Sequence, residues 1–241
     1  IIDTAIEYKK ANKVFSKLNL KSFKINSKIE INKKHENYNL IYKTIVNHLR
    51  DLDISKLNYL LIHNTKNFNK FKNKKKILLN IQKLKKANII NDYGISIYEN
   101  SEFTDFLKID KPAVIQFPFN VFDRRFLNKK NIKLIRKKNI YLQARSCFLQ
   151  GLLNSKKLPS RFSIYRPLFN EWINWCAQNK ILPTEACLLF VNSNKLINEI
   201  IVGVSSLHDL KQILRIKNKK KYLKFSFFDN IDNYLIDPRK W

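Results

Sequence analysis

Three short apolar segments of the chain end in side chains that carry charge or transfer protons. Asp3 follows two isoleucines, Lys28 ends the segment FKINSK, and His63 ends LNYLLIH. Tyr8 lies a few residues beyond Asp3. Continuous apolar runs of this kind are typical of strands buried on both faces of a parallel sheet. In a closed parallel barrel the carboxyl ends of the strands gather at one rim, and we expect the four polar side chains to meet there.

These four residue types suit proton transfer to a carbonyl oxygen. A phenol has a pKa of about 10, and a lysine ammonium in contact with it lowers that pKa. Tyr8 would therefore donate the proton and Lys28 would tune it, while Asp3 would keep the ammonium charged and in place. A neutral imidazole at His63 would donate a hydrogen bond to the substrate carbonyl and orient it. The hydride that completes such a reduction must come from a cofactor, because no side chain supplies one.

The segment DTAIEY, the lysine that ends the next strand and the histidine in LLIH resemble the aldo-keto reductases. Further matching segments follow in order: GISIY (94–98), IQFPFNVFDRR (115–125), ARSCFLQGLL (144–153) and VGVSSLHDL (202–210). The resemblance implies an α/β fold, a (β/α)8 TIM barrel, that extends over residues 1–241 as a single domain with a C-terminal tail at 218–241. It also implies a nicotinamide cofactor and a catalytic tetrad. The tetrad is Asp3, Tyr8, Lys28 and His63.

The same resemblance implies a set of cofactor contacts. Ser96 and Gln116 would bind the carboxamide, for which an amide is suited because it both donates and accepts hydrogen bonds. Arg145 stands where many relatives place an aromatic residue, and a guanidinium can also stack on a ring. The contacts to phosphate, ribose and adenine would come from Ser146, Gly203, Val204, Ser205, Ser206 and Gln212.

The cofactor implied is NADP or NAD, with NADP slightly favoured by the habit of the family. Relatives that prefer NADP carry basic residues in the turn where this chain has Gly203 and Asp209. An acid near a ribose favours a free hydroxyl over a phosphate. The N–H groups at the start of the helix that follows Ser206 would form the anion site.

Some positions depart from the family pattern. Lys9 and Asn12 stand where relatives have a small residue and an acid, and Ile97 stands where they have an asparagine. In the family a first strand and helix precede the DTA segment, whereas this chain opens on IIDTA and contains no methionine. We therefore expect a barrel without its first strand and helix, and a fragment of this kind can be inactive.

The composition limits the partners. A length of 241 residues suits one barrel of this kind. A formal net charge of +28, from 47 Lys and Arg against 19 Asp and Glu, is typical of proteins that bind nucleic acids. The lysines are scattered over every surface segment, as AT-rich coding DNA would produce. We therefore favour a compositional origin of the positive charge over a role in binding polyanions, by roughly three to one. The expected partner is a small carbonyl substrate and not a nucleic acid, and the oligomeric state is left open.

The expected location is the cytoplasm. No apolar run approaches the ~20 residues that span a bilayer, so we expect no membrane partner, and no signal-peptide pattern opens the chain. Cys147, Cys176 and Cys187 show neither the spacing of a disulfide framework nor that of a zinc site, so no metal is expected.

The leading hypothesis is an NAD(P)-dependent oxidoreductase that reduces an aldehyde or ketone, or oxidises the alcohol, by hydride transfer with Tyr8 as proton donor. The segment ARSCFLQGLL resembles a bacterial branch of the family associated with sugar and surface-glycan pathways, which suggests a sugar-derived substrate. One alternative is a catalytically silent barrel that serves as a binding or assembly subunit. The other, which the scattered lysines disfavour, is a basic nucleic-acid-binding protein.

Local patterns give further expectations. The segment YKKANKVFSKL (8–18) predicts a helix with Val14, Phe15 and Leu18 facing inward. Asp123 is expected to cap a helix that starts with DRRF. Trp172 and Trp175 stand at helical spacing and are expected in the core. Each of the three glycines is expected at a backbone position that accepts no side chain.

Overall fold

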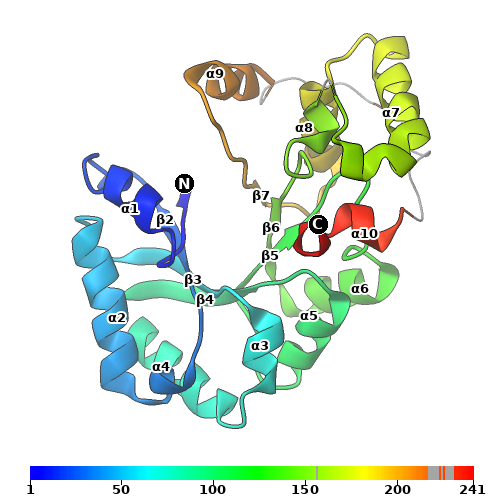
Figure 1. The fold of residues 1–241 in the computed structure, drawn as a ribbon. Coiled ribbons are helices and arrows are strands. Elements are labelled where there is room, and N and C mark those ends of the chain that lie inside the picture. The colour runs from blue at the N-terminus through cyan, green and yellow to red at the C-terminus, as the bar shows by residue number, and fades with distance from the viewer. Residues whose placement is uncertain (156, 217–222, 224, 226–230) are drawn as a thin grey trace. The chain divides into compact units, whose positions relative to one another are not determined.

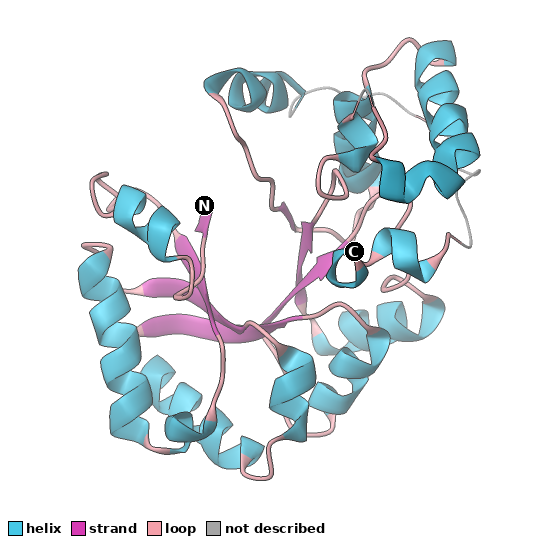
Figure 2. Cartoon of the chain, in the orientation of Figure 1, coloured by secondary structure: helices cyan, strands magenta, loops and turns pink. Residues whose placement is uncertain are grey.

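The computed structural model of the chain describes residues 1–155, 157–216, 223, 225 and 231–241. The expected tail at 218–241 therefore lies partly outside the described residues. Within them, strands and helices alternate along most of the chain (Figure 1; Figure 2). The strands are β1 (Ile2–Asp3), β2 (Ile25–Ile29), β3 (Leu57–Ile62), β4 (Ile90–Ser96), β5 (Val114–Pro118), β6 (Tyr141–Arg145) and β7 (Glu199–Ile200).

Helices connect these strands and follow the last of them. The α-helices are α1 (Lys9–Phe15), α2 (Tyr38–Asp51), α3 (Thr65–Lys70), α4 (Lys74–Lys86), α5 (Asn100–Leu107), α6 (Lys129–Lys138), α7 (Arg166–Gln178), α8 (Pro183–Ser193), α9 (Leu207–Ile216) and α10 (Asn233–Ile236). The short 3-10 helices are η1 (Lys33–Glu36), η2 (Leu152–Asn154), η3 (Ser160–Tyr165) and η4 (Pro238–Lys240). Among the described helices, none combines the length and the apolar character that a bilayer-crossing helix needs.

The strands follow one another in the sheet in the order of the sequence, from β1 to β7. The pairs from β1–β2 to β4–β5 are parallel, and so is β6–β7. The register places Lys28 of β2 beside Leu61 of β3, and Ser96 of β4 beside Gln116 of β5. Parallel neighbours need a crossover of a dozen or more residues, usually a helix, which explains the alternation. This is the connectivity of the expected (β/α)8 fold.

The burial of the elements follows their sequence patterns. Every residue of β2 and of β5 is buried, as strands covered on both faces require. In α2 the buried apolar residues Ile41, Ile45 and Leu49 recur at intervals of four, so one stripe of the helix faces the sheet.

Contacts divide the chain into two compact units. The first consists of Ile1–Gln116 and Lys129–Tyr141, and the second of Phe117–Asn128 and Leu142–Trp241. The first unit contains the whole expected tetrad. The second contains the residues expected at the phosphates, ribose and adenine.

Aromatic side chains form the core of the second unit. Trp172 is completely buried, and its indole Nε1 donates a 2.9 Å hydrogen bond to the Leu153 carbonyl. Its ring stacks on that of Trp175 with centroids 5.7 Å apart, and Phe122 meets it edge-on. The expectation that both tryptophans belong to the core is confirmed.

Two local expectations are wrong. Val14 and Leu18 do not face the core: they are 60% and 52% exposed, and Leu18 lies beyond the end of α1, while Phe15 is partly buried. The residue that α1 buries is Asn12, whose amide satisfies backbone carbonyls of the preceding loop. Asp123 does not cap a helix, since α6 begins only at Lys129 and the Asp123 carboxylate accepts from the Arg125 guanidinium.

The three glycines differ in their surroundings. A Cβ built on Gly94 would lie 2.0 Å from the Val114 carbonyl oxygen and 2.5 Å from its Cγ1, so β4 and β5 touch closely there. Gly151 has φ +86°, which residues with side chains rarely adopt. A Cβ on Gly203 would meet no described atom within 4 Å, so the expectation that this position accepts no side chain is wrong.

Replacing Gly94 with alanine is expected to destabilise the protein by about 3 kcal/mol, because the added methyl group forces β5 away from β4. The change is measured as a lower urea midpoint by circular dichroism. The matched variant Gly203→Ala adds the same methyl group in open space and should stay within about 0.5 kcal/mol of the parent. Equal midpoints for the two variants would contradict the close contact.

Candidate functional site

A buried ion pair joins the ends of the first two strands. Lys28 is only 4% exposed, and its ammonium donates to the carboxylate of Asp3 and, at 3.1 Å, to the Thr4 carbonyl. The other Asp3 oxygen accepts a 2.9 Å hydrogen bond from the side-chain amide of Gln116. The structure thus brings together three of the residues expected from the sequence, from β1, β2 and β5.

The loop that carries Tyr8 is fixed to the same strand ends. The N–H of Ile6 donates to the Lys28 carbonyl at 2.9 Å. The buried amide of Asn12 donates to the Ala5 carbonyl at 2.9 Å and accepts from the Thr4 hydroxyl. Tyr8 itself precedes the first residue of α1, and its side chain is 45% exposed.

His63 lies beside Tyr8. The two rings meet edge to face with centroids 5.8 Å apart, and the N–H of His63 donates to the Ile29 carbonyl at 2.9 Å. The imidazole Nδ1 is 3.4 Å from Glu7 Oε2. The strand-end residues expected from the sequence therefore form two contacting pairs in the first unit, Lys28 with Asp3 and Tyr8 with His63.

Glu7 is a site residue that the sequence reading missed. Its second oxygen, Oε1, accepts a 2.8 Å hydrogen bond from the N–H of Glu30. Burial raises the pKa of the Glu7 carboxyl, but the hydrogen bonds from His63 and from the Glu30 backbone outweigh it, and the pKa is lowered overall. Its position directly before Tyr8 could have pointed to Glu7 in the sequence, because residues next to a reactive side chain lie in the same loop.

Ser96 and Gln116 are both buried and stand in register on β4 and β5. The Ser96 carbonyl accepts a 2.9 Å hydrogen bond from the Thr65 hydroxyl, which fixes the end of β4. The amide nitrogen of Gln116 is used by Asp3. Gln116 therefore helps to hold the ion pair, a role that the sequence alone did not indicate.

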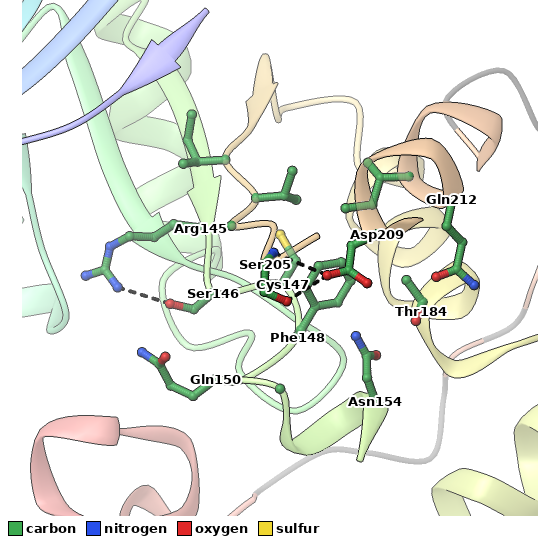
Figure 3. A pocket seen from close by; sticks show the side chains of 15 residues that line it. Arg145, Ser146, Cys147, Phe148, Gln150, Asn154, Thr184, Ser205, Asp209 and Gln212 are labelled. Carbon is green, nitrogen blue, oxygen red and sulfur yellow. Dashed lines mark hydrogen bonds between the residues drawn. The ribbon is translucent and has the colours of Figure 1, made fainter. Parts of the chain in front are cut away.

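The second unit contains a pocket of about 450 Å³ next to the ends of β6 and β7 (Figure 3). Five of the expected cofactor residues line it: Arg145, Ser146, Gly203, Ser205 and Gln212. The lining residues that the sequence reading did not select are Cys147, Phe148, Gln150, Gly151, Asn154, Thr184, Ile201, Val202, Asp209 and Ile213. Four expected residues are not part of this lining: Val204 and Ser206, and also Ser96 and Gln116, which belong to the first unit.

The turn after β6 forms one wall of the pocket and has an unusual backbone. Ser146, Leu149 and Gln150 have φ of +57°, +46° and +54°, and Gly151 continues the series. Left-handed conformations of this kind cost roughly 1–3 kcal/mol for residues with side chains and persist only where the surroundings impose them. Arg145 donates from Nη1 to the Ser146 hydroxyl at 3.2 Å (Figure 3).

The opposite wall leads into α9. The Asp209 carboxylate accepts from both the N–H and the hydroxyl of Ser205, at 3.2 and 2.7 Å, and its own N–H donates to the Ser206 hydroxyl at 3.1 Å. The hydrogen bonds from Ser205 lower the pKa of the Asp209 carboxyl. The first turn of this helix therefore presents a negative charge to the pocket, against the expectation of an anion site.

The polar groups of the pocket fit the adenosine part of a dinucleotide. The buried Oδ1 of Asn154 has no hydrogen-bond partner among the described residues, and an unmatched buried acceptor costs about 1–3 kcal/mol. A ribose hydroxyl or an adenine amino group would satisfy it. Thr184 and Gln212 add groups that donate and accept, and the aromatic ring of Phe148 provides an apolar surface.

The chain is similar to a known family and to solved structures. A sequence profile of the Aldo/keto reductase family matches residues 1–235. No curated protein sequence matches the chain. Among solved structures, the apo form of aldo-keto reductase AKR11C1 from Bacillus halodurans is similar, with a TM-score of 0.73 and 17% identity over 92% of this chain and 77% of that chain. The glycerol dehydrogenase AKR11B4 from Gluconobacter oxydans is similar with a TM-score of 0.63 and 17% identity over 89% of this chain and 79% of that chain.

The structural matches confirm the predicted α/β fold of the (β/α)8 type. The sequence profile extends over nearly the whole chain. It includes the pairs Lys28–Asp3 and Tyr8–His63 and the residues that line the pocket of the second unit. The chain therefore belongs to the aldo/keto reductase family and is, at the level of that family, an NAD(P)-dependent oxidoreductase of carbonyl compounds.

Proposed function

We propose that the protein reduces an aldehyde or ketone to the alcohol, or catalyses the reverse reaction, with Tyr8 as the proton donor. The observation that carries the proposal is the buried Lys28 ammonium, held by Asp3 at the base of the loop that bears Tyr8. A positive charge at this position favours the phenolate form of a nearby tyrosine. The phenol then gives up its proton more readily when the carbonyl oxygen develops negative charge.

The remaining residues of the cluster position the reacting groups. A bound nicotinamide supplies the hydride. Tyr8 gives its hydroxyl proton to the carbonyl oxygen, and Lys28 stabilises the phenolate that remains. Asp3 and Gln116 hold the ammonium in place. Ser96 and Gln116 are proposed to bind the carboxamide, as the resemblance to the family implies.

Glu7 is proposed to position His63. A carboxylate that accepts from Nδ1 fixes the orientation of the ring and leaves Nε2 to meet the substrate carbonyl. The carboxylates of Glu7 and Glu30 both lie close enough to interact with His63.

The pocket of the second unit is proposed to hold the adenosine part of the cofactor. Its polar lining and the unmatched oxygen of Asn154 support this assignment. The family habit favours NADP, whereas Asp209 opposes a phosphate at the ribose. Both cofactors are therefore proposed to bind, with Asp209 setting the ratio of their affinities.

The substrate is proposed to be a small hydroxylated carbonyl compound related to sugars or polyols. The resemblance of ARSCFLQGLL to a branch with sugar substrates supports this class, and one similar structure is a glycerol dehydrogenase. A cytoplasmic location is proposed because Cys147, Cys176 and Cys187 are free thiols, which a reducing compartment preserves.

Replacing Tyr8 with phenylalanine is expected to lower kcat by about 100-fold or more, because general acid catalysis contributes at least this factor. Cofactor affinity should stay within a few fold, since the phenol acts only in the proton transfer. Turnover of glyceraldehyde with NADPH, and fluorescence titration of NADPH, measure the two effects. The control Tyr42→Phe removes an exposed hydroxyl on α2. Equal activity of the Tyr8→Phe variant and the parent would refute the donor role.

Replacing Glu7 with glutamine keeps the shape of the side chain and removes its charge. We expect kcat to fall about tenfold, with cofactor affinity unchanged, because the His63 ring loses the carboxylate that orients it through Nδ1. Glu7→Asp should recover part of the loss. Glu36→Gln removes a carboxylate bound to Asn73, outside this cluster, and serves as control. A change confined to KM would contradict a role in orienting His63.

Replacing Asp209 with asparagine removes one negative charge from the pocket. The ratio of NADPH affinity to NADH affinity is expected to rise about fivefold, which corresponds to ~1 kcal/mol for one charge near a phosphate in a water-like environment. Fluorescence titrations with both cofactors measure the ratio. Glu171→Gln, on α7 and outside the pocket lining, is the charge-matched control. An unchanged ratio would show that Asp209 has no role in selecting between NADPH and NADH.

A further inference from the structure

A second hollow of the first unit lies between α1 and α2, which are neighbours in Figure 1. Its volume is about 670 Å³, which is within the usual range of small-ligand sites. Its lining residues from α1 and the loop before it are Ile6, Lys9, Lys10, Asn12, Lys13 and Ser16. Those from α2 are Thr44, Asn47, His48 and Asp51. The role assigned above to Asp3, Tyr8, Lys28 and His63 uses none of these side chains.

Three lysines concentrate positive charge in this α1–α2 cleft. Lys9, Lys10 and Lys13 are exposed, and none of them forms an ion pair with a described residue. Lys9 and Lys13 are four residues apart on one helix face, where like charges destabilise the helix. Asp51 is the single carboxylate in the lining. An anion bound in the cleft would relieve the repulsion among the lysines.

The neutral groups of the cleft suit a ligand with hydroxyl groups. Asn47 accepts from the Arg50 guanidinium through Oδ1, which leaves the donors of its Nδ2 for a ligand. The hydroxyls of Thr44 and Ser16 donate to backbone carbonyls of their own helices, so their oxygens can act as acceptors. The Asp51 carboxylate is a further acceptor.

His48 adds no charge to the cleft. Its ring is buried, with Nε2 2.8 Å from the hydroxyl of Ser27. Burial lowers the pKa of His48, as does the nearby Lys9, against the opposing effects of Asp51 and Glu7. The ring therefore forms a neutral, rigid part of the floor at physiological pH.

We infer that the α1–α2 cleft binds a phosphate monoester of a small sugar or polyol. Three ammonium groups against one carboxylate leave two net positive charges, which match the charge of about −1.5 to −2 on a phosphate monoester at neutral pH. Lysine binds phosphate well because its ammonium acts as a point charge. The acceptors of Asp51, Thr44 and Ser16 would meet hydroxyl groups of the carbon skeleton.

The inference is tested by calorimetric titration of the full chain, without cofactor, with glucose 6-phosphate. The parent is expected to bind it with one site per chain. The double variant Lys10→Ala, Lys13→Ala should bind at least tenfold more weakly. The control double variant Lys17→Ala, Lys24→Ala loses the same charge outside the cleft and should bind as the parent does. Circular dichroism establishes that both variants are folded, and alanine is favourable in helices.

Two further ligands, glucose and inorganic phosphate, test the contributions of the phosphate group and of the sugar hydroxyls separately. Glucose alone should give no binding, because it lacks the charge, and inorganic phosphate should bind more weakly than glucose 6-phosphate, because it cannot reach the acceptors. Absence of binding to the parent, or equal weakening in both double variants, would overturn the site. Equal affinity for inorganic phosphate and glucose 6-phosphate would overturn the assignment to a sugar or polyol.

Discussion

The charge of Lys28 is the constraint on which the first unit depends. An ammonium that is nearly inaccessible to water is stable only when it is paired and hydrogen-bonded. Asp3 and the Thr4 carbonyl meet this need, and both belong to the short segment around the end of β1. Because the lysine lies at the end of β2, the ion pair fixes two neighbouring strand ends at one position. Removing one partner would leave an unpaired buried charge, which is far more destabilising than the loss of a surface ion pair.

The loop before α1 extends this constraint to the reactive phenol. Thr4 and Ala5 are fully buried, so their polar groups must be satisfied within the protein. Asn12 satisfies them with both ends of its amide, and this explains why α1 buries an asparagine and leaves Val14 and Leu18 exposed. The departure from the family at Asn12 is thus a structural feature of this loop. These contacts fix the loop that carries Tyr8, whose ring also meets His63 edge to face.

The sequence was most informative where strands determine position. The carboxyl ends of parallel strands meet at one edge, so Asp3 and Lys28 could be placed together from their strands alone, whereas the contact of Gln116 with Asp3 was not expected. Loops gave less information, because their conformation depends on hydrogen bonds that have no periodic pattern. Glu7 and Asn154 were missed for this reason. Gly203 was misjudged because a scarcity of glycine does not show which of the remaining glycines is sterically required, and only contact geometry distinguishes it from Gly94.

The two units control their functional groups by different means. In the first, strand register sets the positions of the charged groups, so a substitution among them should alter chemistry more than shape. In the second, left-handed residues shape one wall of the pocket, and each costs about 1–2 kcal/mol that the surroundings must offset. Hydrogen bonds from the segment after β5 help to hold this turn, from Phe119 N–H to the Arg145 carbonyl and from the Asn120 amide to the Ser146 carbonyl. The shape of the pocket therefore depends on residues after β5 that do not line it, and Asn120 controls it from a fully buried position.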